Sequence, residues 1–405
     1  MTIGAGTDMS SSPVITRSRS MRRPSFTILS SNHPASASFF RSIFKFARHT
    51  VRDRNEGLPV WTAVTSTGRA LLRAVRRAIS WLRDHSGSRA RPGFEVRTRV
   101  PAAGEGDRAR PPGRFTEGRF GNATGRTYML YEPAFRKPGP APMLVLLHGC
   151  HQDAKDFAVG TRMNEAAEEA GMVVLYPEQS RLANALRCWN WYTSRYRSAN
   201  EGEAALIVAM TRRVMLDHDI DPARIYIAGM SAGGAMAALL ARDHPGLYAA
   251  LGVHSGVPAA LAHDVFSAMR LMFRGPADGA AGADLPAGGA GHSVPSIVFH
   301  GDEDMTVHPS NGQAIHSAPS GDQAGGLTNG SLEATTYPGA GQHGVTRSVD
   351  YDQGGVTKRE LWIVHGAGHA WAGGSDEGSH TDADGPDASR EMLRFFLQHR
   401  QAGWV

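Results

Sequence analysis

The clearest chemical signal in this 405-residue chain is one serine flanked by small residues. Residues 229–233 read Gly-Met-Ser-Ala-Gly, directly after the strand-like stretch Arg224–Ala228 and at the start of the helix-like stretch Ala232–Asp243. This arrangement is typical of a nucleophile elbow, a strand-to-helix turn that needs small neighbours because its backbone is strained and crowded. We therefore predict Ser231 as a nucleophile at the carboxyl edge of a parallel sheet, with a purely structural turn as the alternative.

A serine hydroxyl is a poor nucleophile at neutral pH and needs a base that is itself oriented by a carboxylate. In this architecture the acid follows the serine in the chain and lies just past a later strand. The predicted strand Ser296–His300 is followed by three carboxylates, Asp302, Glu303 and Asp304. Spacing alone does not choose among them, and we expect the two that are not used to be solvated loop residues.

The base should follow the next strand, which we predict at Glu360–Val364. Two histidines come after it, His365 at the strand terminus and His369 in a glycine-rich loop. Because the chain has 18 histidines, position rather than residue type decides the choice. We predict His369 as the base, since a histidine at the strand terminus is expected to be tied into packing.

Acyl transfer also requires hydrogen-bond donors aimed at the developing oxyanion. The backbone N–H of Ala232, directly after the serine, is expected to be one donor. The other is expected from the loop after the predicted strand Met143–His148, where a His-Gly turn would present the amide of Cys150. An ordinary strand-to-helix turn is the alternative for this loop.

The chain has two cysteines, Cys150 and Cys188, which leaves either one bridge or two thiols and excludes a four-cysteine zinc site. Three tryptophans, Trp189, Trp191 and Trp371, lie near the loops predicted at the active edge. They could form the floor of an acyl or sugar-like substrate site. They could equally belong to the core, and the sequence leaves both interpretations open.

These residues need a scaffold, and beyond Pro101 the sequence alternates strand-like and helix-like segments. Several strand candidates are short, continuously apolar and β-branched, as expected for strands buried on both faces of a parallel sheet. The alternation extends over about 290 residues and predicts an open α/β sheet with surface loops at Gly275–Gly291 and Ser317–Gly330. The remaining strand candidates are Arg114–Phe120, Arg126–Tyr131, Met172–Tyr176 and Ala250–Val253, and the remaining helix candidates are Thr161–Ala170, Glu203–Asp217 and Ala388–Gln401.

Composition and charge divide the chain into two parts. With 41% hydrophobic and 20% charged residues it is globular, and no apolar run reaches the ~18 residues of a membrane-spanning helix. Residues 1–100 carry 18 Lys/Arg against 5 Asp/Glu, whereas residues 101–405 carry 25 against 33. The net charge of +5 therefore does not predict a nucleic-acid partner. We predict a basic, mostly disordered arm over residues 1–100 and a catalytic domain over residues 101–405.

Within the arm, apolar residues at helical spacing among arginines predict a basic amphipathic helix at Gly68–Asp84. This helix either docks on the folded domain or attaches to an anionic or hydrophobic surface, such as a membrane or a storage granule. The stretch Met21–Phe26 loosely resembles a twin-arginine signal but lacks the apolar run of ~7 to 15 residues behind it. This favours a cytoplasmic protein, in which the cysteines are expected to be thiols.

Five sequence blocks add a further indication. They are Leu147-His148-Gly149-Cys150 with Gln152, Cys188-Trp189-Asn190-Trp191, Gly229-Met230-Ser231-Ala232-Gly233-Gly234, His300-Gly301 with Asp304 and Val307, and Gly368-His369-Ala370-Trp371-Ala372-Gly373-Gly374. In their order and spacing they resemble the esterase family of polyhydroxybutyrate depolymerases. The resemblance implies an α/β-hydrolase fold, a mostly parallel sheet with helices on both faces, the triad Ser231, Asp304 and His369, and hydrolysis of carboxylic esters without a cofactor or metal.

The resembled family includes polyhydroxyalkanoate depolymerases and feruloyl and acetylxylan esterases, and many of its members are secreted. Its two cysteine positions are compatible with a bridge, so an extracellular protein is the alternative to a cytoplasmic one. In contrast to the family, we expect no clear signal peptide and no substrate-binding module after the catalytic domain. We predict an ester substrate, either a polyester or an acylated polysaccharide, and leave the oligomeric state open. In a different class, the alternative is a non-catalytic surface- or granule-binding protein on an inert hydrolase domain.

Overall fold

The computed structural model of the chain describes residues 113–121, 126–193, 202–259, 261–277, 294–318, 328–335 and 343–401. The predicted basic arm and its helix at Gly68–Asp84 lie outside the described residues, as do most of the two predicted surface loops. Among the residues that are described, no helix combines the length and the apolar character needed to cross a membrane.

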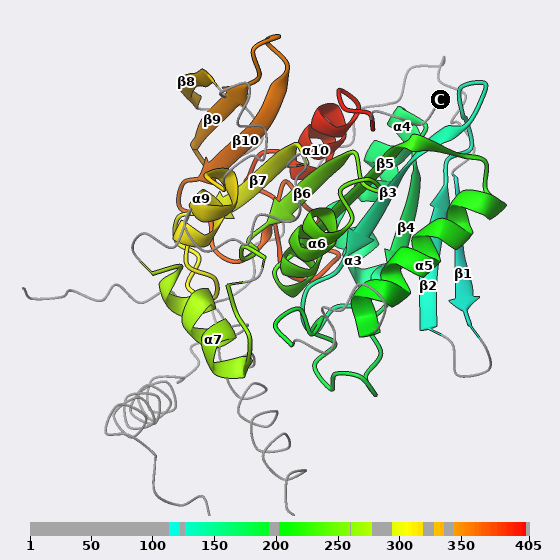
Figure 1. The fold of residues 1–405 in the computed structure, drawn as a ribbon, viewed down its shortest axis with the longest axis horizontal. Coiled ribbons are helices and arrows are strands. Elements are labelled where there is room, and N and C mark those ends of the chain that lie inside the picture. Colours follow the sequence, from blue (N-terminus) through cyan, green and yellow to red (C-terminus); the bar gives the residue numbers. More distant parts are fainter. Residues whose placement is uncertain are drawn as a thin grey trace, which may run out of the picture. The chain divides into compact units, whose positions relative to one another are not determined.

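The described residues form one ten-stranded sheet in the order β1-β2-β4-β3-β5-β6-β7-β10-β9-β8 (Figure 1). The central strands run parallel, and antiparallel strands lie at both edges. The parallel strands are β4 (Val173–Pro177), β3 (Ala141–Leu147), β5 (Ile220–Met230), β6 (Ala250–His254), β7 (Ser296–Gly301) and β10 (Thr357–Val364). The antiparallel strands are β1 (Arg114–Phe120) and β2 (Arg126–Glu132) on one side and β9 (Val345–Tyr351) and β8 (Thr328–Thr335) on the other, with β1 and β8 at the edges. The predicted mostly parallel α/β sheet is confirmed.

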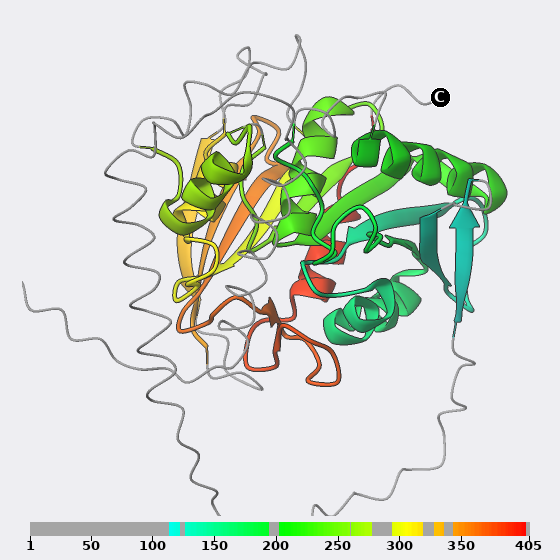
Figure 2. The same cartoon turned by 90° about the horizontal axis from the view of Figure 1, so that it is seen from below.

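Helices cover both faces of this sheet (Figure 2). One face packs against α5 (Gly202–Asp217) and α6 (Ala232–Asp243), drawn in green, and the other against α3 (Ala154–Thr161), α4 (Met163–Ala170) and α10 (Ala388–Phe396). Two further helices are α7 (Val265–Arg274) and α9 (Ser310–His316), and a short parallel pair is formed by β11 (Trp371–Ala372) and β12 (Thr381–Asp382).

Strand β3 shows why its sequence is continuously apolar. Met143, Val145 and Leu147 belong to the core cluster with α5 and α6, whereas Leu144 and Leu146 belong to the cluster with α3, α4 and α10. Successive side chains of a strand point to opposite faces, so a strand covered on both sides must be apolar at every position. This burial fixes the position of the end of β3, and of the His-Gly turn that follows it, at the carboxyl edge of the sheet.

The predicted elements and the structure differ mainly at helix ends and in polar segments. The predicted helix Thr161–Ala170 begins only at Met163, because Arg162 has a left-handed φ of 53° that separates α3 from α4. The predicted final helix ends at Phe396 rather than Gln401. The end of the predicted loop Ser317–Gly330 is wrong, since β8 begins at Thr328. Elements that the sequence pattern does not predict are α3, α7, α9, β8, β9, β11 and β12.

Candidate active site

Ser231 lies in the sharp turn between β5 and α6, as the sequence pattern predicts for an elbow. Its backbone has φ 54° and ψ −119°, an unfavourable conformation for a residue with a side chain. A Cβ atom on Gly233 would lie 2.1 Å from the carbonyl oxygen of Leu147, and one on Gly229 would lie 2.4 Å from the carbonyl carbon of Gly233. The turn therefore needs glycine at both positions, because β3 and the first turn of α6 approach its backbone directly.

Replacing Gly233 by alanine should lower the free energy of unfolding by about 3 kcal/mol or prevent folding. The added Cβ would overlap backbone atoms of β3, which cannot move aside as the end of a flexible side chain can. Chemical denaturation measures the change. Gly246→Ala is the matched control, because a Cβ there meets no heavy atom of the described residues within 4 Å, and we expect a change within about 0.5 kcal/mol. Equal stability of the two variants would contradict this account of the turn.

A buried carboxylate, Asp304, and a half-buried histidine, His369, form a pair beyond the carboxyl ends of β7 and β10. The Nδ1–H group of His369 donates to Oδ2 of Asp304 over 2.7 Å, and the other oxygen of Asp304 accepts from the amides of Thr306 (2.9 Å) and Val307 (2.8 Å). The Asp304 side chain is 0% exposed and that of His369 13%. Burial alone would raise the pKa of Asp304, but His369 and then His300 outweigh it and lower the pKa well below its usual range. The carboxylate is therefore ionised at neutral pH and fixes the orientation of the His369 ring.

The competing residues of the same two loops form a separate pair. Asp302 and His365 lie 2.8 Å apart (Oδ2 to Nδ1) and are 39% and 46% exposed. The other oxygen of Asp302 accepts from the Gly366 amide over 2.7 Å. Asp302 and Glu303 are exposed, as expected for the carboxylates that are not used. The expectation that His365 is tied into packing is wrong, because its ring lies at the surface beside Asp302.

His254, which the sequence interpretation missed, connects the elbow to the loop of His369. Its carbonyl oxygen accepts from the Ser231 amide over 2.9 Å, and its Nε2 accepts from the Ala372 amide over 3.0 Å. The ring stacks on Trp371 at 4.9 Å between centroids. Burial, with smaller effects of His300 and His369, lowers the pKa of His254 to about 3, so the ring is neutral at physiological pH. Its position at the carboxyl end of a predicted buried strand is the signal that could have identified it.

Strand register brings these parts to one edge. Met230 at the end of β5 is paired with His254, and His254 with Phe299 of β7. Phe299 is in turn paired with Trp362 of β10. The carboxyl ends of parallel strands meet at the same edge, which is where open α/β sheets place their sites. Ser231, Asp304 and His369 therefore all follow strands that end at this one edge.

The predicted oxyanion loop lies against the serine. A Cβ atom on Gly149 would lie 3.6 Å from the Ser231 Cβ, so the chain approaching Cys150 passes directly beside the elbow. Ala232, the other predicted donor, is the first residue of α6. Cys150 and Cys188 form a disulfide bond, so the expectation of two thiols is wrong. The two amides predicted as oxyanion donors thus come from elements adjacent to Ser231.

The three tryptophans are buried in the core. Trp189, Trp191 and Trp371 are 1%, 6% and 0% exposed, and all three pack within the two core clusters. The indole N–H groups of Trp189 and Trp371 donate to the His148 carbonyl oxygen and to Ser389 Oγ, each over 3.1 Å. A side chain enclosed in this way cannot present its face to a substrate, so the structure corresponds to the core alternative rather than to a substrate floor.

Within the described part of the chain, no group of three or more His, Cys, Asp or Glu side chains is arranged to hold a metal ion. The groups that this site offers for chemistry are a serine, an oriented histidine and backbone amides. That chemistry is nucleophilic attack on an acyl carbon followed by proton transfer.

Comparisons with known proteins agree with this geometry. The family model described as "Esterase PHB depolymerase" matches residues 126–347. Poly(3-hydroxyalkanoate) depolymerase C of Paucimonas lemoignei is 32% identical over 197 residues, which cover 47% of each chain. Poly(3-hydroxybutyrate) depolymerase of Ralstonia pickettii is 26% identical over 276 residues, which cover 65% of this chain and 55% of that protein. The chain thus spans about half the length of these two relatives.

Carbohydrate esterases are similar as well. Feruloyl esterase B of Thermothelomyces thermophilus is 29% identical over 199 residues, covering 46% of this chain and 67% of that protein. Among solved structures, the acetyl xylan esterase from Aspergillus awamori superposes with a TM-score of 0.52 at 19% identity, covering 71% of this chain and all of that chain. This structural likeness establishes the same fold.

Proposed function

Since the chain belongs to the esterase PHB depolymerase family, we propose that it is a serine esterase that hydrolyses carboxylic esters through a covalent acyl-enzyme. The observation that supports this most directly is the pair of the buried Asp304 and His369, which shares one sheet edge with the strained serine elbow. A buried carboxylate that orients a histidine beside a nucleophile is the arrangement that activates a hydroxyl group.

In the proposed mechanism His369 removes the proton of Ser231 as the serine oxygen attacks the ester carbonyl carbon. Asp304 keeps the proton of the neutral ring on Nδ1, which leaves Nε2 free to accept the serine proton, and it stabilises the imidazolium that forms. The amides of Cys150 and Ala232 stabilise the oxyanion. His369 then protonates the leaving alcohol, and a water molecule activated by the same ring hydrolyses the acyl-enzyme to release the acid and regenerate the serine.

We propose aliphatic polyesters of the polyhydroxyalkanoate type as the substrate class, with acylated polysaccharides as the second candidate. The first rests on the family and on the two bacterial depolymerases, and the second on the similarity to feruloyl and acetylxylan esterases. We propose action in an oxidising, extracellular environment, the alternative to the cytoplasmic location that the sequence favours, and the disulfide between Cys150 and Cys188 supports it. Contact of the basic arm with a granule or an anionic surface remains part of this proposal.

A substrate panel tests the proposal with the purified full chain. We expect turnover of short-chain 4-nitrophenyl esters and, among natural esters, faster release of acid from 3-hydroxybutyrate oligomers than from feruloylated or acetylated sugars. Faster turnover of the sugar esters would replace the first substrate class by the second. If a folded protein hydrolysed none of these esters, the esterase proposal would fail and the binding-protein alternative would stand. Removal of residues 1–100 further separates an esterase from a binding protein. An esterase should keep its turnover of soluble esters, whereas a binding protein should lose its only activity.

A further inference from the structure

The peptide groups beside the proposed oxyanion site are held by two buried side chains. The amide of Gly149 donates to Oε1 of Gln152 over 3.0 Å, and its carbonyl oxygen accepts from Nδ1 of His148 over 2.8 Å. Both side chains are buried, with His148 1% and Gln152 2% exposed. Gly149 is thus held on both sides, directly before the residue whose amide is predicted to face the oxyanion.

The hydrogen bonds of His148 define which ring nitrogen has the proton. The amide of Gln179 donates to Nε2 over 3.1 Å, so Nε2 is the acceptor and the proton of the neutral ring is on Nδ1, facing the Gly149 oxygen. Burial lowers the pKa of His148 to about 4, so this neutral form persists at physiological pH. The ring is therefore a permanent donor to the Gly149 carbonyl group.

This contact sets the direction of the Cys150 amide. The Gly149 carbonyl and the Cys150 N–H belong to one planar trans peptide group and point in opposite directions. With the oxygen turned toward His148, the N–H must point away from it. If this peptide rotated by half a turn, the carbonyl oxygen would take the place of the N–H and would repel an oxyanion.

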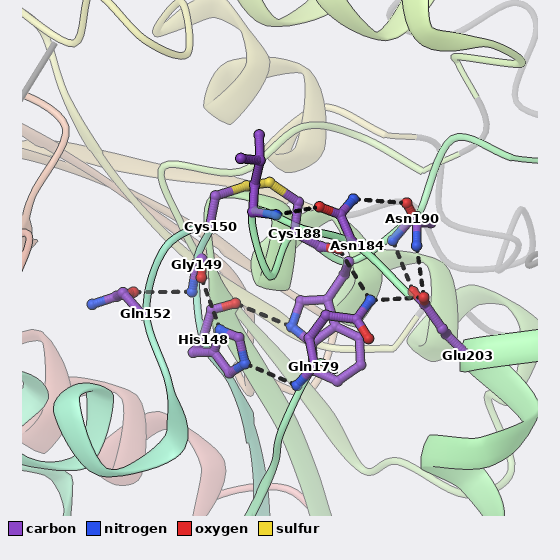
Figure 3. The surroundings of a disulfide bond; sticks show 11 residues. His148, Gly149, Cys150, Gln152, Gln179, Asn184, Cys188, Asn190 and Glu203 are labelled. Carbon is purple, nitrogen blue, oxygen red and sulfur yellow. Dashed lines mark hydrogen bonds between the residues drawn. A yellow bond between two sulfur atoms is a disulfide. The ribbon is translucent and has the colours of Figure 1, made fainter. Parts of the chain in front are cut away.

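The disulfide bond and Gln179 hold the loop on the side of Cys150 (Figure 3). Cys150 is linked to Cys188 by the disulfide, and the Cys188 carbonyl oxygen accepts from Nε2 of Gln179 over 3.0 Å. Gln179 therefore contacts His148 through its backbone N–H group and Cys188 through its side-chain amide. Its Nε2 also donates to the buried carboxylate of Glu203 over 2.7 Å. The disulfide limits the position of Cys150. The peptide before it is held at the Gly149 carbonyl oxygen, which accepts from the His148 ring over 2.8 Å and, over the longer distance of 3.4 Å, from the Gln152 backbone amide.

We propose that His148 is a positioning residue for the oxyanion site, because it holds the Gly149 carbonyl group so that the Cys150 amide faces the tetrahedral intermediate. The inference rests on the proposed esterase function. The His148 side chain is buried and need not touch the substrate. Substitution of His148 should therefore weaken stabilisation of the transition state, seen in kcat, and leave ground-state binding of the substrate unchanged.

Two substitutions of His148 separate the two ring contacts. In H148N the side-chain amide can place a donor near the position of Nδ1, so it can still donate to the Gly149 oxygen. In H148Q the longer side chain can place its Oε1 near the position of Nε2 and accept from the Gln179 backbone amide. Its NH₂ group then lies away from the position of Nδ1 and is not placed to donate to the Gly149 oxygen. We expect H148Q to lower kcat by about 10-fold to 100-fold with KM changed less than about threefold, and H148N to stay within about fivefold of the wild type.

A boronic acid provides the readout that a merely structural role would not change. Butylboronic acid forms a tetrahedral adduct with a catalytic serine, whereas butyrate resembles the ground-state product. In H148Q the inhibition constant of butylboronic acid should rise in parallel with the loss of kcat, while that of butyrate should stay constant. Equal losses in H148N and H148Q, or equal shifts of both inhibition constants, would overturn the proposal.

Folding and the esterase activity itself are tested separately. Thermal unfolding of each variant shows whether it is folded, and if H148Q is not, H148S removes both ring contacts without added bulk and is compared with H148N in the same way. An active wild type with an unchanged kcat in H148Q would refute the positioning role alone. A folded wild type without ester turnover would instead refute the proposed function.

Discussion

Replacement of Ser231 by alanine should lower kcat for 4-nitrophenyl butyrate by at least about 10⁴-fold while leaving the fold intact. Without the hydroxyl group no acyl-enzyme can form, and only the residual effect of the oxyanion donors and of substrate binding remains. The fold should persist because serine already has a Cβ atom, so alanine adds no strain at φ 54°. The serine amide that donates to the His254 carbonyl oxygen is also retained.

The experiment compares the rates and the unfolding temperatures of wild type and variant in one preparation series. Ser317→Ala is the matched control, because Ser317 is an exposed serine at the end of α9, outside the site. It should keep the full rate. A wild-type rate in S231A would remove Ser231 from the mechanism and with it the interpretation of the elbow as a nucleophile.

Replacement of Asp304 by asparagine should lower kcat by about 10³-fold to 10⁴-fold. The asparagine side chain keeps the shape but can turn its NH₂ group toward His369, which favours the ring form with the proton on the wrong nitrogen. The buried imidazolium would also lose the negative charge that stabilises it during the reaction. The measurement is kcat at constant pH. The unfolding temperature is measured as a check on folding, because Oδ1 of Asp304 also accepts hydrogen bonds from two backbone amides that hold the loop.

The chain has a matched control for this variant two residues earlier. Asp302 also accepts from a histidine ring over 2.8 Å, but this pair is exposed to solvent. Because water screens such a pair, Asp302→Asn should change kcat by less than about threefold. The reverse result, a large loss in D302N and a small one in D304N, would transfer the roles of acid and base to Asp302 and His365.

Much of the fold could be predicted because each signal is local. Burial on both faces leaves continuous apolar runs, so the parallel strands are visible in the sequence, and α6 has the predicted bounds Ala232–Asp243. The strands β8 and β9 could not be predicted in the same way, because neither has a continuous apolar run. Their sequences, TNGSLEAT in β8 and VTRSVDY in β9, are mostly polar. The break at Arg162 is likewise invisible in the pattern, since a left-handed residue within a helical stretch depends on its surroundings.

The kinds of residue at the site and their order along the chain can be identified from the sequence. The elbow is a local turn, and its glycines and its flanking strand and helix are neighbours in sequence, so Ser231 could be recognised without a structure. The blocks around Cys150, Asp304 and His369 each follow a predictable strand end. These local patterns were enough for the fold class and for the proposed reaction.

Which side chains contact one another is seen in the folded chain and not in the sequence. Asp304 and His369 are 65 positions apart, and their contact depends on strand register and on side-chain direction rather than on spacing. The same is true of the disulfide, of the burial of the three tryptophans, and of the buried rings of His148 and His254. Each of these features results from contacts between segments that are distant in the chain. Such contacts exist only once the sheet has formed. The sequence could therefore indicate these residues, by a strand end or by a resemblance, but not the contacts that their side chains make.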